Sequence, residues 1–228
     1  TEDTIFDVAA MTTVLATTPA LMVLSERGQL RLDDPAAIYI PEFKGGGKEA
    51  ITLRHLLTHT SGFSRTLSRA PDWSDFKRAF QLVCAERPAS APGARFLYSD
   101  INFIILGEVV HRVAGMPLHE FAAREIFRPL KMEDTDYLPS SEKRSRIAPT
   151  EKVGRDVLRG IVHDPKAQQM GGVAGHAGVF TTAADLARFA RMILQGGALE
   201  GVRILKPETV AMMTRVQTPP EVQARRGL

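Results

Sequence analysis

The stretch FDVAAMTTVLATTPALMVLSERG, residues 6–28, is the part of the sequence that decides how the chain folds. Its middle, residues 8–24, contains no charged side chain. This apolar segment is shorter than the roughly 20 residues that a membrane-spanning helix needs, so we expect a buried core helix. Asp7 can accept hydrogen bonds from the free N–H groups at the start of such a helix. Gly28 can end it.

The composition is that of an ordinary globular protein: 228 residues with 44% hydrophobic and 24% charged residues. A chain of this length can bury a large core without metal ions or disulfide bridges. Its single cysteine, Cys84, cannot form an internal bridge. The 29 lysines and arginines are scattered among 26 acidic residues, for a net charge of +3. Nucleic-acid binding needs a concentrated basic patch, so we expect no nucleic-acid partner.

Apolar residues at helical spacing predict further helices over residues 52–60, 76–85, 101–113, 117–126 and 182–194. The last of these begins with TAAD, residues 182–185, which is a capping-box pattern. We expect a short strand over 201–205 and a final helix that begins at Pro207. Residues 138–170 are polar and interrupted by prolines, which predicts long loops of the kind that often border sites. The whole is predicted to be rich in helices and poor in strands.

Several short motifs follow one another along the chain in a definite order. They are FDVAAMTTV at residues 6–14, ERGQLRLDDP at 26–35, LRHLLTHTSG at 53–62, PG at 92–93, FLYSD at 96–100 and FIILG at 103–107. Together with IFRPLKM at 126–132 and the segment 171–192, they resemble the serine β-lactamase-related hydrolases. This family comprises class C β-lactamases, D-alanyl-D-alanine peptidases and family VIII carboxylesterases. Each motif alone is weak evidence, but the ordered set covers nearly the whole chain.

The resemblance implies an α+β fold of the β-lactamase/transpeptidase-like type. In that family an antiparallel sheet is built from strands at both ends of the chain, and we expect those strands to be missing here. We therefore expect one incomplete β-lactamase-like domain over residues 1–228, in which residues 36–165 form approximately the helical subdomain and its loops. The apolar face of the first helix would then lose its cover and leave a large exposed patch.

Chemistry in this family depends on a Ser-x-x-Lys pair at the start of the first long helix. Residues three apart lie on one helix face, so the lysine amine can withdraw the serine proton. The helix N-terminus also favours the developing negative charge. In this sequence Ala10 occupies the serine position and Thr13 the lysine position. Alanine has no attacking atom and threonine has no basic amine, so both catalytic side chains are replaced.

Neither threonine of this window is expected to take over from the serine. Thr12 lies about 200° around the helix from Ala10, on the wrong face. Thr13 lies on the correct face but one turn deeper, without a lysine beside it. An unactivated hydroxyl is a poor nucleophile. We expect both threonines to be helix-interior residues that bond to the preceding turn.

The motif YSD at residues 98–100 resembles the family's Tyr-x-Asn element, which often reads Tyr-Ser-Asp in esterases. The resemblance makes Tyr98 the proton shuttle between nucleophile and leaving group, and places Ser99 and Asp100 in the substrate site. A tyrosine acts as a base only where positive charge lowers its pKa. Because Thr13 replaces the lysine, we expect Tyr98 to be disabled as a base. Simple aromatic packing at a loop-to-helix junction is the alternative for Tyr98.

The glycine-rich segment 171–178 invites assignment as the family's third motif, Lys/His-Thr/Ser-Gly. We reject this assignment because the family has a similar segment just before a capped helix, and residues 182–194 form that helix. The third motif is expected beyond Leu228. The segment is then a tight backbone crossing near the cleft, where His176 lines the substrate pocket. By the same resemblance His163-Asp164 lies near the rim of the site, although plain surface polarity fits this pair equally well.

His55 and His59 are four residues apart on a predicted helix, which is a spacing found in metal sites. The residues between them lack the glutamate of the His-Glu-x-x-His zinc proteases. No cluster of acidic or cysteine residues supplies further ligands. We expect capped or core-packed histidines, no metal and no other cofactor.

The resemblance implies acyl transfer: a serine ester formed from an ester, a β-lactam or a peptidoglycan-like peptide, then hydrolysed. With Ala10 and Thr13 in the catalytic positions, our hypothesis is a bacterial serine hydrolase-family protein, most like an esterase, that is catalytically impaired. The alternatives are a non-catalytic binding or scaffold pseudoenzyme, and a fragment that another chain completes. We expect a small-molecule ligand and no membrane span. The oligomeric state and the compartment, cytoplasmic or periplasmic, stay open.

Overall fold

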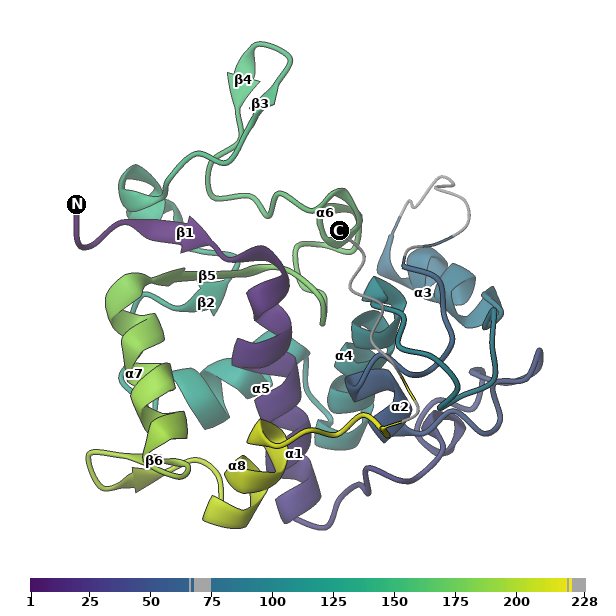
Figure 1. Ribbon diagram of the computed structural model, residues 1–228. Coiled ribbons are helices and arrows are strands. Elements are labelled where there is room, and N and C mark those ends of the chain that lie inside the picture. The colour runs from purple at the N-terminus through teal and green to yellow at the C-terminus, as the bar shows by residue number, and fades with distance from the viewer. Residues whose placement is uncertain (66, 68–74, 221, 223–228) are drawn as a thin grey trace.

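The computed structural model describes residues 1–65, 67, 75–220 and 222, and shows a helix-rich α+β arrangement. The N-terminal helix runs through the middle of the molecule, with α4 (Asp100–Ala114) packed against it and α7 (Ala183–Leu194) on its other side (Figure 1). Further α-helices are α2 (Leu53–Leu57), α3 (Phe76–Ala85), α5 (Leu118–Ala122), α6 (Pro165–Gln169) and α8 (Pro207–Thr214). The helices predicted from apolar spacing are therefore present, and α3 has the predicted bounds.

The first helix consists of three consecutive segments: a 3₁₀ turn, Ala9–Met11, a π-helical turn, Thr13–Thr17, and α1, Thr18–Glu26. The Asp7 carboxylate accepts the backbone N–H of Ala9 at 2.9 Å, so it satisfies a free donor at the helix start as predicted. At the other end Gly28 has a φ of +69°, a backbone conformation that glycine adopts without strain. Short π-helical turns inside α-helices occur frequently at functional sites.

By length and composition alone, the helical stretch Ala9–Glu26 could cross a membrane. The bent pair of Asp100–Ala114 and Leu118–Phe127 passes the same test when taken together. However, 61% of the Ala9–Glu26 window is buried inside the protein, as expected for a core helix. Burial among neighbouring helices accounts for the absence of charge in residues 8–24.

A three-stranded antiparallel sheet lies beside the start of the first helix. Its strand order is β1 (Ile5–Asp7), β5 (Val179–Thr182), β2 (Asp136–Tyr137), with Phe6 opposite Thr181. All four residues of β5 are buried. Sequence alone did not predict this sheet, because a fully buried short strand shows no alternation of apolar and polar residues.

Two small hairpins complete the described strands. The strand expected over 201–205 is β7 (Val202–Arg203), which pairs with β6 (Ala198–Leu199). Within residues 138–170, the expected loops contain a second hairpin of β3 (Lys152–Val153) and β4 (Asp156–Val157). That hairpin projects from the body of the molecule (Figure 1). The expectation of little regular structure there is correct, apart from this hairpin, a 3₁₀ turn and α6.

Strand β5 holds the beginning of the first helix in place. The Val8 N–H donates to the Val179 carbonyl oxygen, and the Val179 N–H donates to the Thr12 hydroxyl, both at 3.1 Å. Two short segments that are far apart in sequence thereby fix the turn that contains Ala10.

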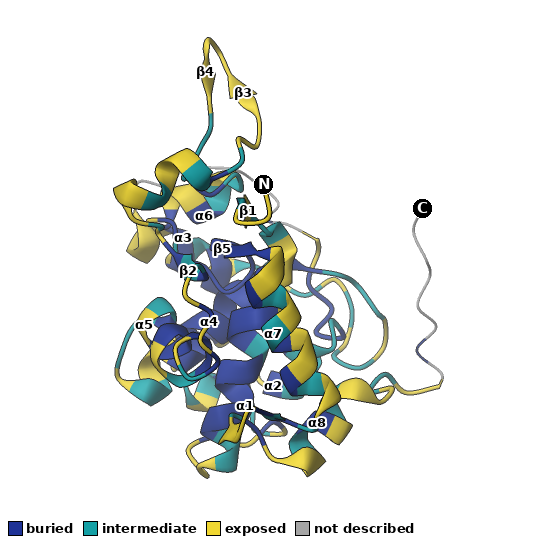
Figure 2. Cartoon of the chain, turned by 90° about the vertical axis from the view of Figure 1, so that its left-hand side faces the viewer, coloured by how far each residue is buried: buried dark blue, intermediate teal, exposed yellow. Residues whose placement is uncertain are grey.

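Helix α4 is the centre of the core. Its residues 101–110 are all buried, and Figure 2 shows α4 and α1 as dark blue elements beneath the more exposed α7. Two glycines let the backbone of the 171–178 segment lie directly on α4. A Cβ built on Gly107 would be 3.1 Å from the Gly175 Cα, and a Cβ built on Gly175 would be 1.9 Å from the Phe103 carbonyl oxygen. The tight backbone crossing predicted for this segment is thus present.

The capping box predicted for residues 182–185 is only half correct. The Thr182 hydroxyl accepts the Asp185 N–H at 3.2 Å and caps α7. The Asp185 carboxylate does not return to Thr182, because it accepts the Asp134 N–H and the Thr135 hydroxyl, both at 2.8 Å. A complete capping box instead begins α2, where Thr52 and His55 bond reciprocally.

Candidate active site

The start of the first helix is accessible at the position of the expected nucleophile. Ala10 is exposed, and the Thr13 hydroxyl donates to the Ala10 carbonyl oxygen at 2.8 Å. The two residues therefore lie on one face of the helix, one turn apart. Ala9 adopts a φ of +48°, which is uncommon for a residue other than glycine and is found preferentially at functional positions.

The two threonines of this window have different partners. Thr13 bonds to the preceding turn, as predicted. Thr12 does not: its side chain is fully buried and accepts the Val179 N–H of β5. The prediction for Thr12 was wrong in its partner, since β5 packs against that side of the helix. Its burial on the far face agrees with the helical geometry that excluded it as a nucleophile.

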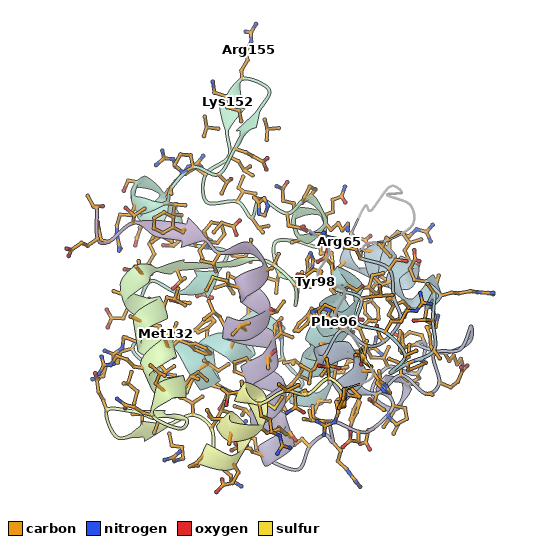
Figure 3. The ribbon with its side chains drawn as sticks, viewed as in Figure 1. Arg65, Phe96, Tyr98, Met132, Lys152 and Arg155 are labelled. Atoms are coloured by element: carbon orange, nitrogen blue, oxygen red, sulfur yellow. The ribbon has the colours of Figure 1, made fainter. Side chains whose placement is uncertain are left out.

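Tyr98 lies between the N-terminal helix and the residues that begin α4, with Arg65 and Phe96 close by (Figure 3). Burial raises its pKa above the usual range, and the charges of Asp100 and Asp164 act in the same direction. The Arg65 guanidinium, 5.8 Å from the centre of the Tyr98 ring, opposes them incompletely. At neutral pH the Tyr98 side chain is a protonated phenol, which can donate a hydrogen bond but cannot accept a proton as a base.

Ser99 and Asp100 have distinct roles beside Tyr98. The Ser99 side chain is buried, and its hydroxyl donates to the Ser64 carbonyl oxygen at 2.6 Å. Asp100 begins α4, and its carboxylate lies 3.9 Å from the Lys166 ammonium. Ser99 and Asp100 were both predicted to lie in the substrate site, and of these two Asp100 has the partly exposed side chain.

His176 is buried, with an exposed fraction of 3%. Its Nε2 atom lies 3.0 Å from Oδ1 of Asp164. Burial alone would raise the pKa of Asp164. The interaction with His176, the hydrogen bond from the Ala167 N–H and the charge of Lys166 together outweigh it and hold the pKa at about 2. His163-Asp164 is therefore more than plain surface polarity, because Asp164 orders α6 by accepting the Ala167 N–H at 2.8 Å.

The carboxylate of Asp7 connects the helix start to this loop. One oxygen accepts the Ala9 N–H, and the other accepts the His163 N–H at 2.7 Å. Lys166, on α6, continues the connection to Asp100. The structure thus brings together the Ala10 turn, the YSD motif and the loop that holds His176. Sequence reasoning gave Asp7 only a capping role and did not single out Arg65 or Lys166, because these contacts depend on the tertiary fold.

The described residues contain no group of three or more histidine, cysteine, aspartate or glutamate side chains that could hold a metal ion. Nδ1 of His55 accepts the Thr52 N–H at 3.2 Å, and Nδ1 of His59 accepts the Ser99 N–H at 3.1 Å. Both histidines are thus held by hydrogen bonds inside the protein, in agreement with the prediction of capped or core-packed side chains.

The family model for β-lactamases matches residues 1–228. The chain therefore belongs to the β-lactamase family. A relative from Escherichia coli strain K12, provisionally named a D-alanyl-D-alanine carboxypeptidase, is 33% identical over 94% of this chain and 56% of its own length. The chain spans little more than half the length of such curated relatives.

Solved structures show the same fold. A provisionally assigned β-lactamase from Bacteroides dorei superposes with a TM-score of 0.78 and 26% identity, over all of this chain and 61% of its own. A class C β-lactamase from Rhodobacter sphaeroides has a TM-score of 0.75 and 23% identity, over 94% of this chain and 57% of its own. A family VIII carboxylesterase shares the fold at a TM-score of 0.77 and 24% identity, over 93% and 62%. The predicted β-lactamase/transpeptidase-like α+β class is confirmed.

Proposed function

We propose that this chain binds ligands of the acyl-transfer type, meaning esters, β-lactams or D-Ala-D-Ala-like peptides, without forming a covalent acyl intermediate. The observation that carries the proposal is Ala10 at the nucleophile position, with Thr13 in place of the lysine one turn later. A methyl group cannot attack a carbonyl carbon. The Thr13 hydroxyl has no amine character and already donates its proton to the Ala10 carbonyl oxygen.

The environment of Tyr98 supports the same proposal. Removing a proton from a nucleophile requires a phenolate, whereas burial and two nearby carboxylates keep the pKa of Tyr98 raised. A protonated phenol is suited to donate a hydrogen bond to a carbonyl or carboxylate oxygen of a ligand. The side chain therefore fits a binding role better than a role in proton transfer.

The frame around the replaced residues supports binding rather than loss of the site. Strand β5 still holds the first turn of the helix through Val179, and Asp7 still ties this turn to the 163–164 loop. The positive end of the helix dipole at Ala10 favours an anionic or strongly polarised ligand oxygen. The name of the Escherichia coli relative makes a D-Ala-D-Ala-type peptide the first ligand to test.

The experiment combines covalent and non-covalent readouts on the purified chain. Intact mass spectrometry after exposure to a fluorescent penicillin and to a fluorophosphonate is expected to show no added mass. Nitrocefin and p-nitrophenyl butyrate are expected to show neither a burst nor turnover. Reversible binding of a fluorescent D-Ala-D-Ala peptide and of the penicillin, measured by fluorescence anisotropy, is the positive result. Acylation of any serine or threonine would overturn the proposal.

A restoration experiment tests whether the two substitutions are the only defect. The double variant Ala10→Ser/Thr13→Lys, placed in a chain with the full length of the relatives, is expected to recover esterase activity. The single variant Ala10→Ser is the matched control and is expected to remain inactive, because its serine has no base. If the double variant does not recover esterase activity, the result would favour the alternative in which the whole site has become a binding module.

A further inference from the structure

His59 follows α2 by two residues and lies directly against the YSD motif. Its ring is 4.5 Å from the ring of Tyr98, centre to centre, at an angle of 31°. Phe96 and Phe103 enclose the same imidazole at 6.0 and 5.3 Å. No part of the family resemblance gave this histidine a role.

Both residues that flank Tyr98 donate their backbone N–H groups to His59. The Leu97 N–H donates to the His59 carbonyl oxygen at 2.8 Å. The Ser99 N–H donates to Nδ1 of the imidazole at 3.1 Å. One residue thus holds the backbone on either side of Tyr98 and also contacts its ring.

A buried amide fixes the orientation of the His59 ring. Asn102 and Ser61 are both fully buried, and the Ser61 hydroxyl donates to the Asn102 side-chain oxygen at 2.6 Å. The amide nitrogen of Asn102 therefore faces Nδ1 of His59, at 3.1 Å, and donates to it. Because Nδ1 accepts from two N–H donors, it carries no proton, and a neutral His59 must hold its proton on Nε2.

The backbone of His59 is also unusual. Its φ is +55°, a left-handed conformation that costs free energy for most residues but is tolerated by asparagine, aspartate and histidine. This conformation is retained where the surrounding contacts impose it. Burial lowers the pKa of His59 to about 4, with no charged group contributing to the shift. The accepting nitrogen is therefore preserved at neutral pH.

We propose that His59 is the positioning residue for Tyr98: it fixes the phenol for ligand binding through two flanking backbone bonds and one ring face. The inference rests on the proposed function of the site, since it concerns how that site is held. In this role His59 itself contacts no reacting atom. Arg65 lies over the ring of Tyr98 as well, so His59 and Arg65 together confine the phenol.

Two variants separate the contributions of His59. His59→Asn keeps a residue that tolerates positive φ and a side-chain oxygen that can accept the Ser99 N–H, but it removes the ring. His59→Phe keeps an aromatic ring but removes the acceptor. The matched control is His55→Asn, because His55 lies one turn earlier and its Nδ1 also accepts a backbone N–H, that of Thr52, without an aromatic contact to Tyr98 among the described residues.

The first readout is NMR of the chain labelled in histidine and tyrosine, with Tyr98→Phe to assign the phenol signal. We expect the ¹⁵N spectrum to show an unprotonated Nδ1 and a protonated Nε2 for His59 at neutral pH. In His59→Asn the shift that the imidazole ring current causes in the Tyr98 signals should be lost. The pKa of Tyr98 should fall toward its ordinary value, because the phenol becomes less buried. Neither change is expected in His55→Asn. A protonated Nδ1, or equal changes in both variants, would overturn the proposal.

The second readout is binding of the fluorescent penicillin. Loss of the positioned phenol is expected to weaken binding about tenfold in both His59 variants, and less than about twofold in His55→Asn. If the unmodified chain does not bind the penicillin, the proposed function fails while the NMR comparison still decides the role of His59. If it binds and the His59 variants bind equally well, the positioning role is refuted and the proposed function stands.

Discussion

Asp164 and His176 meet at a single oxygen: Oδ1 of Asp164 lies 3.0 Å from Nε2 of His176 and also accepts the Ala167 N–H at 2.8 Å. One atom therefore begins α6 and holds the buried histidine of the glycine-rich segment. Both bonds, together with the charge of Lys166, overcome the effect of burial and hold the pKa of Asp164 at about 2.

Two substitutions of Asp164 should separate its capping bond to the Ala167 N–H from its charged contact with His176. Asp164→Ala removes both and leaves a buried imidazole nitrogen without its partner, so the free energy of unfolding should fall by about 2–3 kcal/mol. Asp164→Asn keeps the cap and should cost about 1 kcal/mol. Urea denaturation measures both. The control is Asp75→Ala at the exposed cap of α3, whose carboxylate accepts the Arg78 N–H and has no further hydrogen bond to the residues that the structure describes. Equal losses in Asp164→Ala and Asp75→Ala would show that His176 gains nothing from the contact.

The low pKa of His59 predicts a specific dependence of stability on pH. The unfolded chain binds a proton at His59 below about pH 6.5, whereas the folded chain does so only below about pH 4. The stability contributed by the neutral histidine is therefore complete above pH 6.5 and is lost as the pH falls toward 4. The maximum loss is about 3 kcal/mol.

Urea denaturation between about pH 4.5 and pH 7 tests this slope. His55 also has a lowered pKa because of burial, so the measurement compares the unmodified chain with His59→Asn rather than reading one curve alone. The variant should show a shallower dependence across this window. Parallel curves would mean that His59 titrates normally in the folded protein. Asp164 does not interfere, since it loses its contribution only below its ordinary pKa of 3.8.

The helices could be predicted from sequence because their signals are local. Asp75 at the cap of α3 and Thr182 at the cap of α7 sit beside apolar stripes that need no knowledge of the rest of the chain. Strand β5 could not be predicted in this way, because it is buried on both faces and pairs with β1, which is far away in sequence. Its pairing is a tertiary property that no local pattern records.

The candidate site divides in the same way. Ala10, Thr13 and Tyr98 were singled out as candidates because ordered motifs marked their positions. The contacts that connect these residues could not be predicted from sequence, since the bond from the His163 N–H to Asp7 spans 156 residues. His59 was considered only for its spacing to His55, which left a metal ligand or a capped or core-packed histidine as the choices and favoured the second. Its contact with Tyr98 appears only when α2 and the start of α4 are brought together by folding.

Gly175 should tolerate no side chain. A Cβ there would lie 1.9 Å from the Phe103 carbonyl oxygen and 3.0 Å from the Gly107 nitrogen, and both are backbone atoms of the central helix. Gly175→Ala is therefore expected to lower the free energy of unfolding by more than about 3 kcal/mol, or to prevent folding. The control is Gly171→Ala, where nothing lies within 4 Å and only the φ of +85° is strained. That variant should cost about 1 kcal/mol and remain folded by circular dichroism. Comparable stability of the two variants would mean that α4 and the 171–178 segment are farther apart in solution.

The same crossing depends on a hydroxyl inside the π-helical turn of the first helix. Thr17 donates to the Gly175 carbonyl oxygen at 2.7 Å, and its side chain is fully buried. Thr17→Val keeps the shape but leaves that carbonyl without its donor, so the free energy of unfolding should fall by about 1–3 kcal/mol. Thr13→Val is the matched control. The Thr13 hydroxyl also donates to a carbonyl oxygen, that of Ala10, but Ala10 is exposed, so water can replace the lost bond. A change within about 0.5 kcal/mol is expected there.

Hydrogen exchange of the α4 amides adds a local readout. Faster exchange in Thr17→Val but not in Thr13→Val would place the loss of stability at the crossing of α4 and the 171–178 segment. Unchanged exchange in both variants would contradict this prediction.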